Sequence, residues 1–435
     1  MRLLILRVLQ TKTTVPHLPT NFPINFGPFN FSAQRRWRKP ENTAQTRLES
    51  RTRDLKLDRL MSRLRKLGFA LHLFDLMSKR RGPFVSVQIM SRWAGVVGLR
   101  INVGEFLRKY PHVFEIFTHP LKRNLCCRVT SKMLDLVDEE RVLTQERELE
   151  NVRTLKKLLM MSKSGTLRIH ALRLVRRELG LPRDFRDSIL QKYSNDFKLI
   201  DFEIVGLVDR DGGLATEEVE KWREKEYREK WLSEYETKYA FPINFPTGFK
   251  IEKGLKENVK NWQRMPYVKP YENEIARSHA SGAIQRSEKR VVGILHEFLS
   301  LTVEKMVEVE RLAHFRRDLG IDVNVRELLL KHPGIFQIST KGNGQTVFLR
   351  EAYNKDGLVE PDPIYVVRRK MLDLLLLGCR DTRELKSREA TKEARRVVTD
   401  DSVKGSADSK RGGYSLFEDS DDTCHTPKEE LNKSH

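Results

Sequence analysis

The sequence of 435 residues contains only four cysteines, and no two of them form a CxxC pair. Cys126 and Cys127 are adjacent, whereas Cys379 and Cys424 stand alone far downstream. This spacing excludes a disulfide framework and argues against a structural zinc site. No apolar run approaches the roughly 18–20 residues that a membrane-spanning helix needs. A disulfide-rich secreted mini-protein and a helical membrane protein are therefore both excluded.

The familiar catalytic signatures are also missing. His296-Glu297 begins an HExxH zinc motif, but Ser300 stands where the second histidine is required. The chain has no GxxxxGKS or GxxxxGKT loop for a triphosphate. A nucleophilic Cys126 or Cys127 would need a positioned histidine, and no partner is recognisable, so we expect both to be structural thiols on a strand. We expect no enzyme activity, no metal and no cofactor.

Acidic residues are absent from the first 40 positions, which hold seven basic ones. Arginines spaced along an apolar stretch without acids are typical of an organelle transit peptide. We therefore expect residues 1–45 to be such a presequence. The arginine bias and the single serine, Ser32, favour a mitochondrion over a chloroplast. The alternative is a plain disordered basic arm.

The excess of basic residues is concentrated in the middle of the chain. There are 81 lysines and arginines against 60 acids, a formal net charge of +21. Residues 381–435 hold 11 basic and 13 acidic side chains and few core-forming ones, so we expect a disordered tail. Subtracting +7 for the first 40 residues and −2 for the tail from +21 leaves +16 for the middle. Such a charge favours a polyanionic partner.

Three segments of the middle share one spacing. A glycine between apolar residues is followed four positions later by Asn or Asp, and seven positions later by an acid. The glycines are Gly98, Gly180 and Gly320. Glycine suits the left-handed residue that ends a helix, and Asn or Asp is a good N-cap for the next helix. The pattern predicts two helices joined by a turn in each segment.

A β-hairpin is predicted after the second helix of the unit. Pro111 and Pro333 end that helix in the first and third segments, and an alternating Phe-x-Ile sequence then favours a strand. A second strand is predicted at 125–129 and at 346–349. We therefore expect a mainly α fold with short β-hairpins, built from repeated winged-helix-like helix-turn-helix-hairpin units. The units span about 84–140, 167–210 and 286–352.

Two other regions of the middle are predicted to be helical. An apolar face predicts a helix over 57–68 that ends at Gly68, followed by a second helix over 69–77. A charged helix is predicted at about 217–240, where aromatic residues recur every four positions and favour a packing face over a base-stacking one. These aromatic residues are Tyr227, Trp231, Tyr235 and Tyr239.

Basic side chains recur near equivalent places in the units and are candidate phosphate contacts. The Arg176-Arg177 pair lies opposite an apolar stripe, which favours phosphate binding there. Lysines that end the second helix suit the helix dipole equally well. The candidates are Lys79, Arg80, Arg81, Arg92, Arg100, Lys109, Lys122, Arg123, Arg173, Arg176, Arg177, Arg316, Arg317 and Lys331.

Several blocks of the sequence resemble one known family. They are the run from Asp58 to Gly68, the Phe-Leu-Arg-Lys-Tyr-Pro block before Phe114, the Leu-Leu-Leu-Lys-His-Pro block before Phe336, and Trp262–Tyr267. Over residues 50–372 the chain is similar to the plant organellar RNA recognition (PORR) domain of WHAT'S THIS FACTOR-like proteins. The resemblance implies a plant mitochondrial or chloroplast protein that binds RNA and promotes splicing of group II introns. It supplies no agreed contact residues, so the candidates above depend on charge and spacing alone.

The sequence thus predicts an organellar RNA-binding protein that aids mRNA processing without catalysing it. Its expected partner is organellar intron RNA, in a ribonucleoprotein particle that can include other splicing factors. We expect no membrane partner. The alternatives are an organellar DNA-binding protein, because winged helices often bind duplexes, and a structural protein associated with the organellar ribosome.

Overall fold

A computed structural model describes residues 44–230, 237–251, 253–272, 283–354 and 357–377. The predicted presequence, apart from its last two residues, and the predicted disordered tail lie outside the described residues. Helix α1 (Ala44–Ser50) belongs to one unit of the chain, and the residues from Arg51 onward form a second unit. All the sheets and sites described below belong to the second unit.

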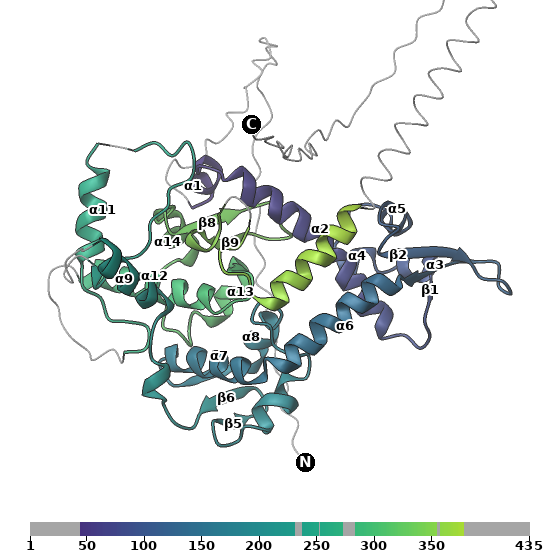
Figure 1. Cartoon of the computed structure of the whole chain (residues 1–435), viewed down its shortest axis with the longest axis horizontal. Helices are drawn as coiled ribbons and strands as arrows, with labels where there is room; N and C mark the ends of the chain where they lie inside the picture. Colours follow the sequence, from purple (N-terminus) through teal and green to yellow (C-terminus); the bar gives the residue numbers. More distant parts are fainter. Residues whose placement is uncertain (1–43, 231–236, 252, 273–282, 355–356, 378–435) are drawn as a thin grey trace, which may run out of the picture. The chain divides into compact units, whose positions relative to one another are not determined.

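The described residues contain three small antiparallel sheets, each with its three strands in the order first-third-second. In each sheet the last two strands form a hairpin, and the first strand precedes the short helices of that segment. Figure 1 labels the β5–β6 and β8–β9 hairpins. The strands are β1 (Val85–Ser86), β2 (Phe114–Thr118) and β3 (Leu125–Val129), then β4 (Thr166–Arg168), β5 (Phe197–Asp201) and β6 (Ile204–Leu207), then β7 (Met306–Glu308), β8 (Phe336–Ser339) and β9 (Thr346–Leu349). The prediction of a mainly α fold with short hairpins is confirmed.

Short helices lie between the first and second strands of each sheet. The shared glycine has a left-handed backbone in all three segments, with φ of +80°, +71° and +66° at Gly98, Gly180 and Gly320. A β-carbon is disfavoured there, which explains the common glycine. The helices and helical turns are α3 (Val87–Ser91), α4 (Ala94–Val97), α5 (Val103–Lys109), α8 (Ile169–Leu174), the π-helix η1 (Arg186–Gln191), α13 (Val309–Leu312), η3 (Ala313–Phe315) and α14 (Val325–Lys331).

The predicted N-caps are confirmed in the first and third segments. The Asn102 side chain accepts a hydrogen bond from the backbone N–H of Gly104, and Asn324 accepts from two backbone N–H groups of α14. The second segment differs, because Asp184 accepts through its backbone oxygen and η1 begins two residues later. Phe185, which precedes η1, has a helical rather than an extended backbone, so no side-chain cap forms.

The predicted helix ends and the second strands of two hairpins are confirmed, whereas other strands were missed. Helices α5 and α14 each end two residues before their proline, and strands β3 and β9 have the predicted bounds. The first strand of each sheet, and β6 in the second, were not predicted. These strands have two to four residues. Strands of this length contain too few residues to show the alternating apolar pattern that predicts a strand from sequence.

The prediction that a helix ends at Gly68 is wrong, because α2 (Leu55–Ser78) continues through it. A single glycine inside a helix costs only about 1 kcal/mol relative to alanine. Burial of the residues on both sides, Leu67 at 3% exposed and Phe69 at 7%, offsets that cost. The side chain of Asp54 caps the start of α2 by accepting from two of its backbone N–H groups.

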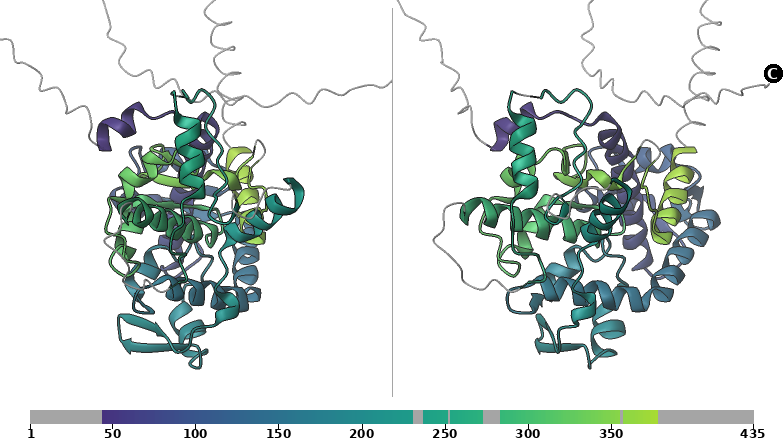
Figure 2. Two further views of the ribbon diagram at one scale, coloured as in Figure 1. Left: turned by 90° about the vertical axis from the view of Figure 1, so that its left-hand side faces the viewer. Right: turned by 60° about the vertical axis from the view of Figure 1, so that its left-hand side comes forward.

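Longer helices connect the three sheets. They are α6 (Ser131–Glu146), α7 (Glu148–Met161), α9 (Glu218–Lys230), α11 (Leu255–Arg264) and α12 (Ala283–Ser300), with short turns η2 (Gly212–Leu214) and η4 (Arg350–Ala352). Helix α9 confirms the first part of the helix predicted at 217–240. Figure 2 shows the teal β5–β6 hairpin at the bottom of both views.

The aromatic stripe of that helix is only partly a packing face. The ring of Tyr239 lies edge-on to that of Tyr267, with 5.9 Å between the ring centres, so it packs as predicted. Tyr227 is instead 52% exposed. The two aromatic residues between them, Trp231 and Tyr235, lie outside the described residues.

Helix α2 takes part in two hydrophobic cores. Its second half packs with the first sheet and its helices, and its first half packs with residues of the third segment such as Phe348. The helical residues 363–377 contribute to both cores as well, through Ile364 to one and Met371 to the other. Two helices from opposite ends of the described chain therefore hold the first and third segments together.

A buried arginine lies where the three segments meet. Arg368 is 5% exposed, and it donates to Glu140 on α6 at 2.8 Å and to Glu304 before β7 at 3.1 Å. It also donates to the backbone oxygen of Arg177, at 2.9 Å, in the second segment. Burial raises the pKa of Glu140, but Arg368 and Arg177 outweigh it and hold that pKa below its usual value. One guanidinium thus connects all three segments.

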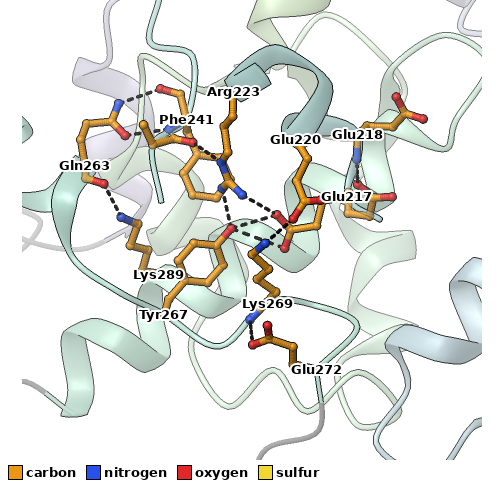
Figure 3. A network of polar contacts seen from close by, with 12 residues as sticks. Glu217, Glu218, Glu220, Arg223, Phe241, Gln263, Tyr267, Lys269, Glu272 and Lys289 are labelled. Carbon is orange, nitrogen blue, oxygen red and sulfur yellow. Dashed lines mark hydrogen bonds and ion pairs between the residues drawn. The ribbon is translucent and has the colours of Figure 1, made fainter. Parts of the chain in front are cut away.

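A second buried polar network holds residues 262–267 against α9 and α12 (Figure 3). Arg223 donates to Glu217 at 3.1 Å and to the Tyr267 hydroxyl at 2.8 Å. The ammonium of Lys289, which is fully buried, donates to three backbone oxygens, including those of Trp262 and Met265, at 2.6 to 3.0 Å. Burial lowers the pKa of Lys289 to about 7, while the three acceptors favour its ammonium form.

We expect Arg368→Met to lower the free energy of unfolding by about 3–5 kcal/mol at pH 7, because it removes the partner of the buried Glu304 carboxylate and of the half-buried Glu140 carboxylate. Chemical denaturation followed by circular dichroism measures the change. The matched control is the neighbouring Arg369→Met, whose partly exposed ion pair with Asp373 at 3.9 Å should contribute less than about 1 kcal/mol.

The acid dependence of the Arg368 variant provides a second test. The depressed pKa of Glu140 contributes stability that is present above the unfolded pKa and is lost as the pH falls through the folded one. Without Arg368 the Glu140 carboxylate protonates more readily, so the difference in unfolding free energy between wild type and variant should narrow as the pH falls toward 4. A difference that stays constant would show that the ion pairs are not its cause.

Candidate nucleic-acid interface

Four of the predicted basic residues line one pocket in the first segment. Lys79, Arg80 and Arg81 follow the end of α2, and Lys122 lies in the turn between β2 and β3. All four are exposed, and the pocket has a volume of about 620 Å³. The described residues that line it include no acid. We call it the basic-aromatic pocket and define it by Lys79, Arg80, Arg81, Phe84, His119 and Lys122.

The hairpin turn that carries Lys122 has a defined geometry. The Nδ1 atom of His119 accepts hydrogen bonds from the backbone N–H groups of Leu121 and Lys122, each at 3.2 Å. The N–H of Arg123, whose φ is +49°, donates to the backbone oxygen of His119 at 2.9 Å. The imidazole therefore acts as an acceptor that orders the tip of the hairpin, and the cation is presented on an ordered turn.

Aromatic rings form the other part of the basic-aromatic pocket. Phe84 is 36% exposed, and its ring meets those of Phe117 and His119 at 5.6 and 5.3 Å between centres. The guanidinium of Arg128 lies 5.5 Å from the centre of the Phe117 ring and donates to both oxygens of Glu115 at 2.8 Å. A partly exposed ring among cations is the combination on which a nucleobase stacks while its phosphates are neutralised.

The remaining candidates are dispersed. Arg92, Arg100 and Arg123 are exposed in the first segment without lining this pocket, and Lys109 is half-buried. Arg173 and Arg317 are exposed in the second and third segments. Arg316 donates to the backbone oxygen of Ile321 at 3.3 Å, and Lys331 pairs with Glu288 at 2.8 Å. The structure therefore does not bring the fourteen candidates into one surface.

The pair most strongly favoured by the sequence lies in a different setting. Arg176 and Arg177 are half-buried in a cleft of about 440 Å³, which acids including Asp75, Asp138 and Glu140 also line. Burial lowers the pKa of Arg177, and neighbouring Arg368 lowers it further. Because carboxylates already surround these guanidinium groups, reversing their charge would disturb the junction beside Arg368 as well as any ligand.

Sequence reasoning missed the two aromatic members of the basic-aromatic pocket. Phe84 stands just before the two-residue strand β1, where no periodicity marks it. His119 directly follows β2, and only its contacts with the turn reveal its role. The run Lys79-Arg80-Arg81 and the turn residue Lys122 were both candidates from the sequence, but their spacing gave no indication that they would lie at the same pocket.

Cys127 of the first sheet lacks the electrostatic setting of a nucleophile. Both Cys126 and Cys127 are buried on β3 with free thiols. Burial raises the pKa of Cys127 to about 12, which opposes formation of the reactive thiolate. Among the described residues, no cluster of three or more His, Cys, Asp or Glu side chains is arranged to hold a metal ion. None of their helices is long and apolar enough to cross a membrane.

Comparison with known proteins identifies the family. The plant organelle RNA recognition domain family matches residues 52–380. The chain belongs to this family. Its members are RNA-binding factors of plant organelles, so the protein is an organellar RNA-binding protein of the RNA-processing class, as the sequence resemblance implied. No solved structure matches the chain significantly.

The curated relatives include proteins of both organelles. The chain is 38% identical over 352 residues to Protein ROOT PRIMORDIUM DEFECTIVE 1 of Arabidopsis thaliana, with 78% of this chain and 86% of that protein covered. It is 30% identical to Protein WHAT'S THIS FACTOR 1, chloroplastic, of Zea mays, with 75% of this chain and 66% of that one covered. It is also 30% identical to Protein WHAT'S THIS FACTOR 9, mitochondrial, of Arabidopsis thaliana, with 67% and 75% covered.

Proposed function

We propose that this protein promotes splicing of group II introns in plant mitochondria by binding intron RNA and holding it in a productive shape. A group II intron contains the reacting groups in its own fold, so a protein can help without supplying catalytic groups. The protein must instead neutralise the negative charge of the RNA phosphates and hold single-stranded or junction nucleotides in one conformation. The basic-aromatic pocket is the observation on which the proposal depends.

The pocket combines the two contacts that single-stranded RNA requires. Lys79, Arg81 and Lys122 are exposed cations within one 620 Å³ hollow, which suits a turn of sugar-phosphate backbone. Phe84 offers a ring to an unstacked base, which contributes about 1–3 kcal/mol when bases stack on protein aromatics. Base stacking favours an open strand over a duplex, because paired bases in a helix have no free face.

We further propose that each of the three segments is a winged-helix-like unit. A strand, a pair of helices joined by a turn, and a hairpin whose last strand pairs with the first strand form such a module. In this interpretation the β2–β3 hairpin is the wing of the first unit, and its tip carries Lys122 and Arg123. The wing then contributes to RNA binding together with the end of α2.

The triple variant Lys79→Glu, Arg81→Glu and Lys122→Glu should weaken binding of a single-stranded RNA at least tenfold. Removal of three phosphate contacts should also reduce the slope of log affinity against log salt by about 2, at roughly 0.7 per contact for single strands. Fluorescence anisotropy of labelled RNA between about 50 and 200 mM salt measures both. Arg80 is left intact because its guanidinium packs 5.9 Å from the Trp93 ring.

The matched control reverses the exposed Lys225 and Arg228 of α9, which pair with acids on the same helix. It should bind RNA like the wild type. Equal binding by the triple variant, or equal loss in the control, would contradict an RNA site at the basic-aromatic pocket. Preference for a duplex DNA of equal length would favour the DNA-binding alternative, and sedimentation with ribosomal subunits after nuclease treatment would favour the ribosomal one.

Loss of the protein should reduce splicing of a subset of organellar group II introns while leaving transcript initiation unchanged. Sequencing of organellar RNA from a knockout plant, scored intron by intron for spliced and unspliced reads, measures this. Complementation with the wild-type chain should restore splicing, and complementation with the triple variant should not. Normal splicing of every intron in the knockout would contradict the proposal.

The mitochondrial assignment depends on the first segment of the sequence. Residues 1–45 fused to a fluorescent protein should direct it to mitochondria in plant cells, because arginines along an apolar stretch without acids are typical of such presequences. Fluorescence in chloroplasts would leave the proposed role in intron splicing intact but move it to that organelle. A cytosolic signal would contradict the presequence.

A further inference from the structure

Arg290 on α12 is a buried cation without a visible counter-ion. It is 6% exposed, and its Nε has no hydrogen-bond partner. Its neighbour Lys289 is buried too, but that ammonium has three backbone acceptors. Within the described residues, no hydrogen bond or ion pair to Arg290 is found. A buried charge is costly unless it is paired, so an anion that reached this guanidinium would be stabilised there.

Arg290 lines a pocket of about 730 Å³ at the end of α7. The loop that follows α7 and the residues that follow β6 form two of its walls, with Lys163, Ser164 and Arg210 among the lining residues. Two acids also line it, but neither pairs with Arg290. Asp209 accepts from the backbone N–H of Arg210 at 2.8 Å, and Glu272 accepts from the backbone N–H of Lys269 at 3.0 Å.

The walls of this pocket combine polar and apolar surface. Arg210 donates to the backbone oxygens of Met160 and Tyr271, at 2.8 and 3.1 Å, and so joins α7 to the loop that contains Tyr271. Leu159 and Val208 are among the apolar lining residues. Pockets of about 300–1,000 Å³ that combine apolar walls with a few polar groups are typical of sites for small organic ligands.

We propose that this pocket binds a phosphate group carried by a nucleoside, with Arg290 as its principal anion contact. The planar guanidinium matches two phosphate oxygens at once, and the apolar wall suits a base or sugar. A free nucleotide and the terminal nucleotide of an RNA share this chemistry. Binding of an RNA end rests on the proposed RNA-binding function, whereas binding of a free nucleotide does not.

The test uses the full chain, in a buffer free of phosphate, with inorganic phosphate and adenosine 5′-monophosphate as probes. Thermal unfolding and titration calorimetry should show binding of adenosine 5′-monophosphate to the wild type and to Arg286→Met, the matched control in the exposed first turn of α12. Binding to Arg290→Met should be at least tenfold weaker. Without ligand, Arg290→Met should unfold at the same temperature as the wild type or higher, because the variant removes an unpaired buried charge.

Three results would overturn the proposal. They are no binding of either probe by the wild type up to about 10 mM, equal binding by Arg290→Met, or a clearly lower unfolding temperature for that variant, which would show that the guanidinium has a structural partner. Binding of inorganic phosphate with exclusion of the nucleotide would overturn the nucleoside part.

A pair of identical RNA oligonucleotides, one with a 5′-phosphate and one with a 5′-hydroxyl, separates the two sources. A preference of about tenfold for the 5′-phosphate, lost in Arg290→Met, assigns the pocket to an RNA end. Equal binding of both oligonucleotides, with binding of adenosine 5′-monophosphate retained, assigns it to a free nucleotide. The Lys79, Arg81 and Lys122 variant should keep nucleotide binding, so failure of the proposed RNA interface is distinguishable from failure of this site.

Discussion

The buried guanidinium of Arg368 is the contact on which the arrangement of the three segments depends. Each segment is a small sheet with short helices, too small to bury a sufficient core alone. Hydrophobic packing along α2 and along residues 363–377 brings the first and third segments together, but apolar contacts have little directionality. Arg368 adds direction, because its fixed donors meet a carboxylate from α6, a carboxylate before β7 and a backbone oxygen of the second segment.

The three segments share a strand order but differ in which hairpin strands are exposed, and this difference sets which surface each segment offers to a ligand. Both strands of the third hairpin, β8 and β9, are buried along their whole length, and Arg51 at the start of the second unit donates to the backbone oxygen of Ile338 at 2.9 Å. The hairpin of the first segment keeps exposed positions on both strands and a cationic tip. A shared sequence pattern therefore does not imply a shared ligand.

Most of the cations described above fall into two groups. Arg223, Lys289 and Arg368 are buried and satisfied by acids, hydroxyls or backbone oxygens, so they stabilise the fold. Lys79, Arg81 and Lys122 are exposed around a pocket without acids, so they remain available for a polyanion. The Trp262–Tyr267 block carries part of the family resemblance. It serves the fold, because its backbone oxygens accept hydrogen bonds from the buried Lys289. Charge counts alone cannot separate these two groups.

The sequence by itself determined the local features of this protein. A left-handed glycine, an Asn cap and a proline stop act within a few residues, so the turns at Gly98 and Gly320, the ends of α5 and α14 and the bounds of β3 and β9 followed from spacing. Tertiary structure decided the rest, because burial and pairing depend on residues far apart in the chain. Only the folded structure shows that Lys122 lies at the same pocket as Lys79 and that acids surround Arg177. Burial on both sides of Gly68 likewise explains why α2 continues through it.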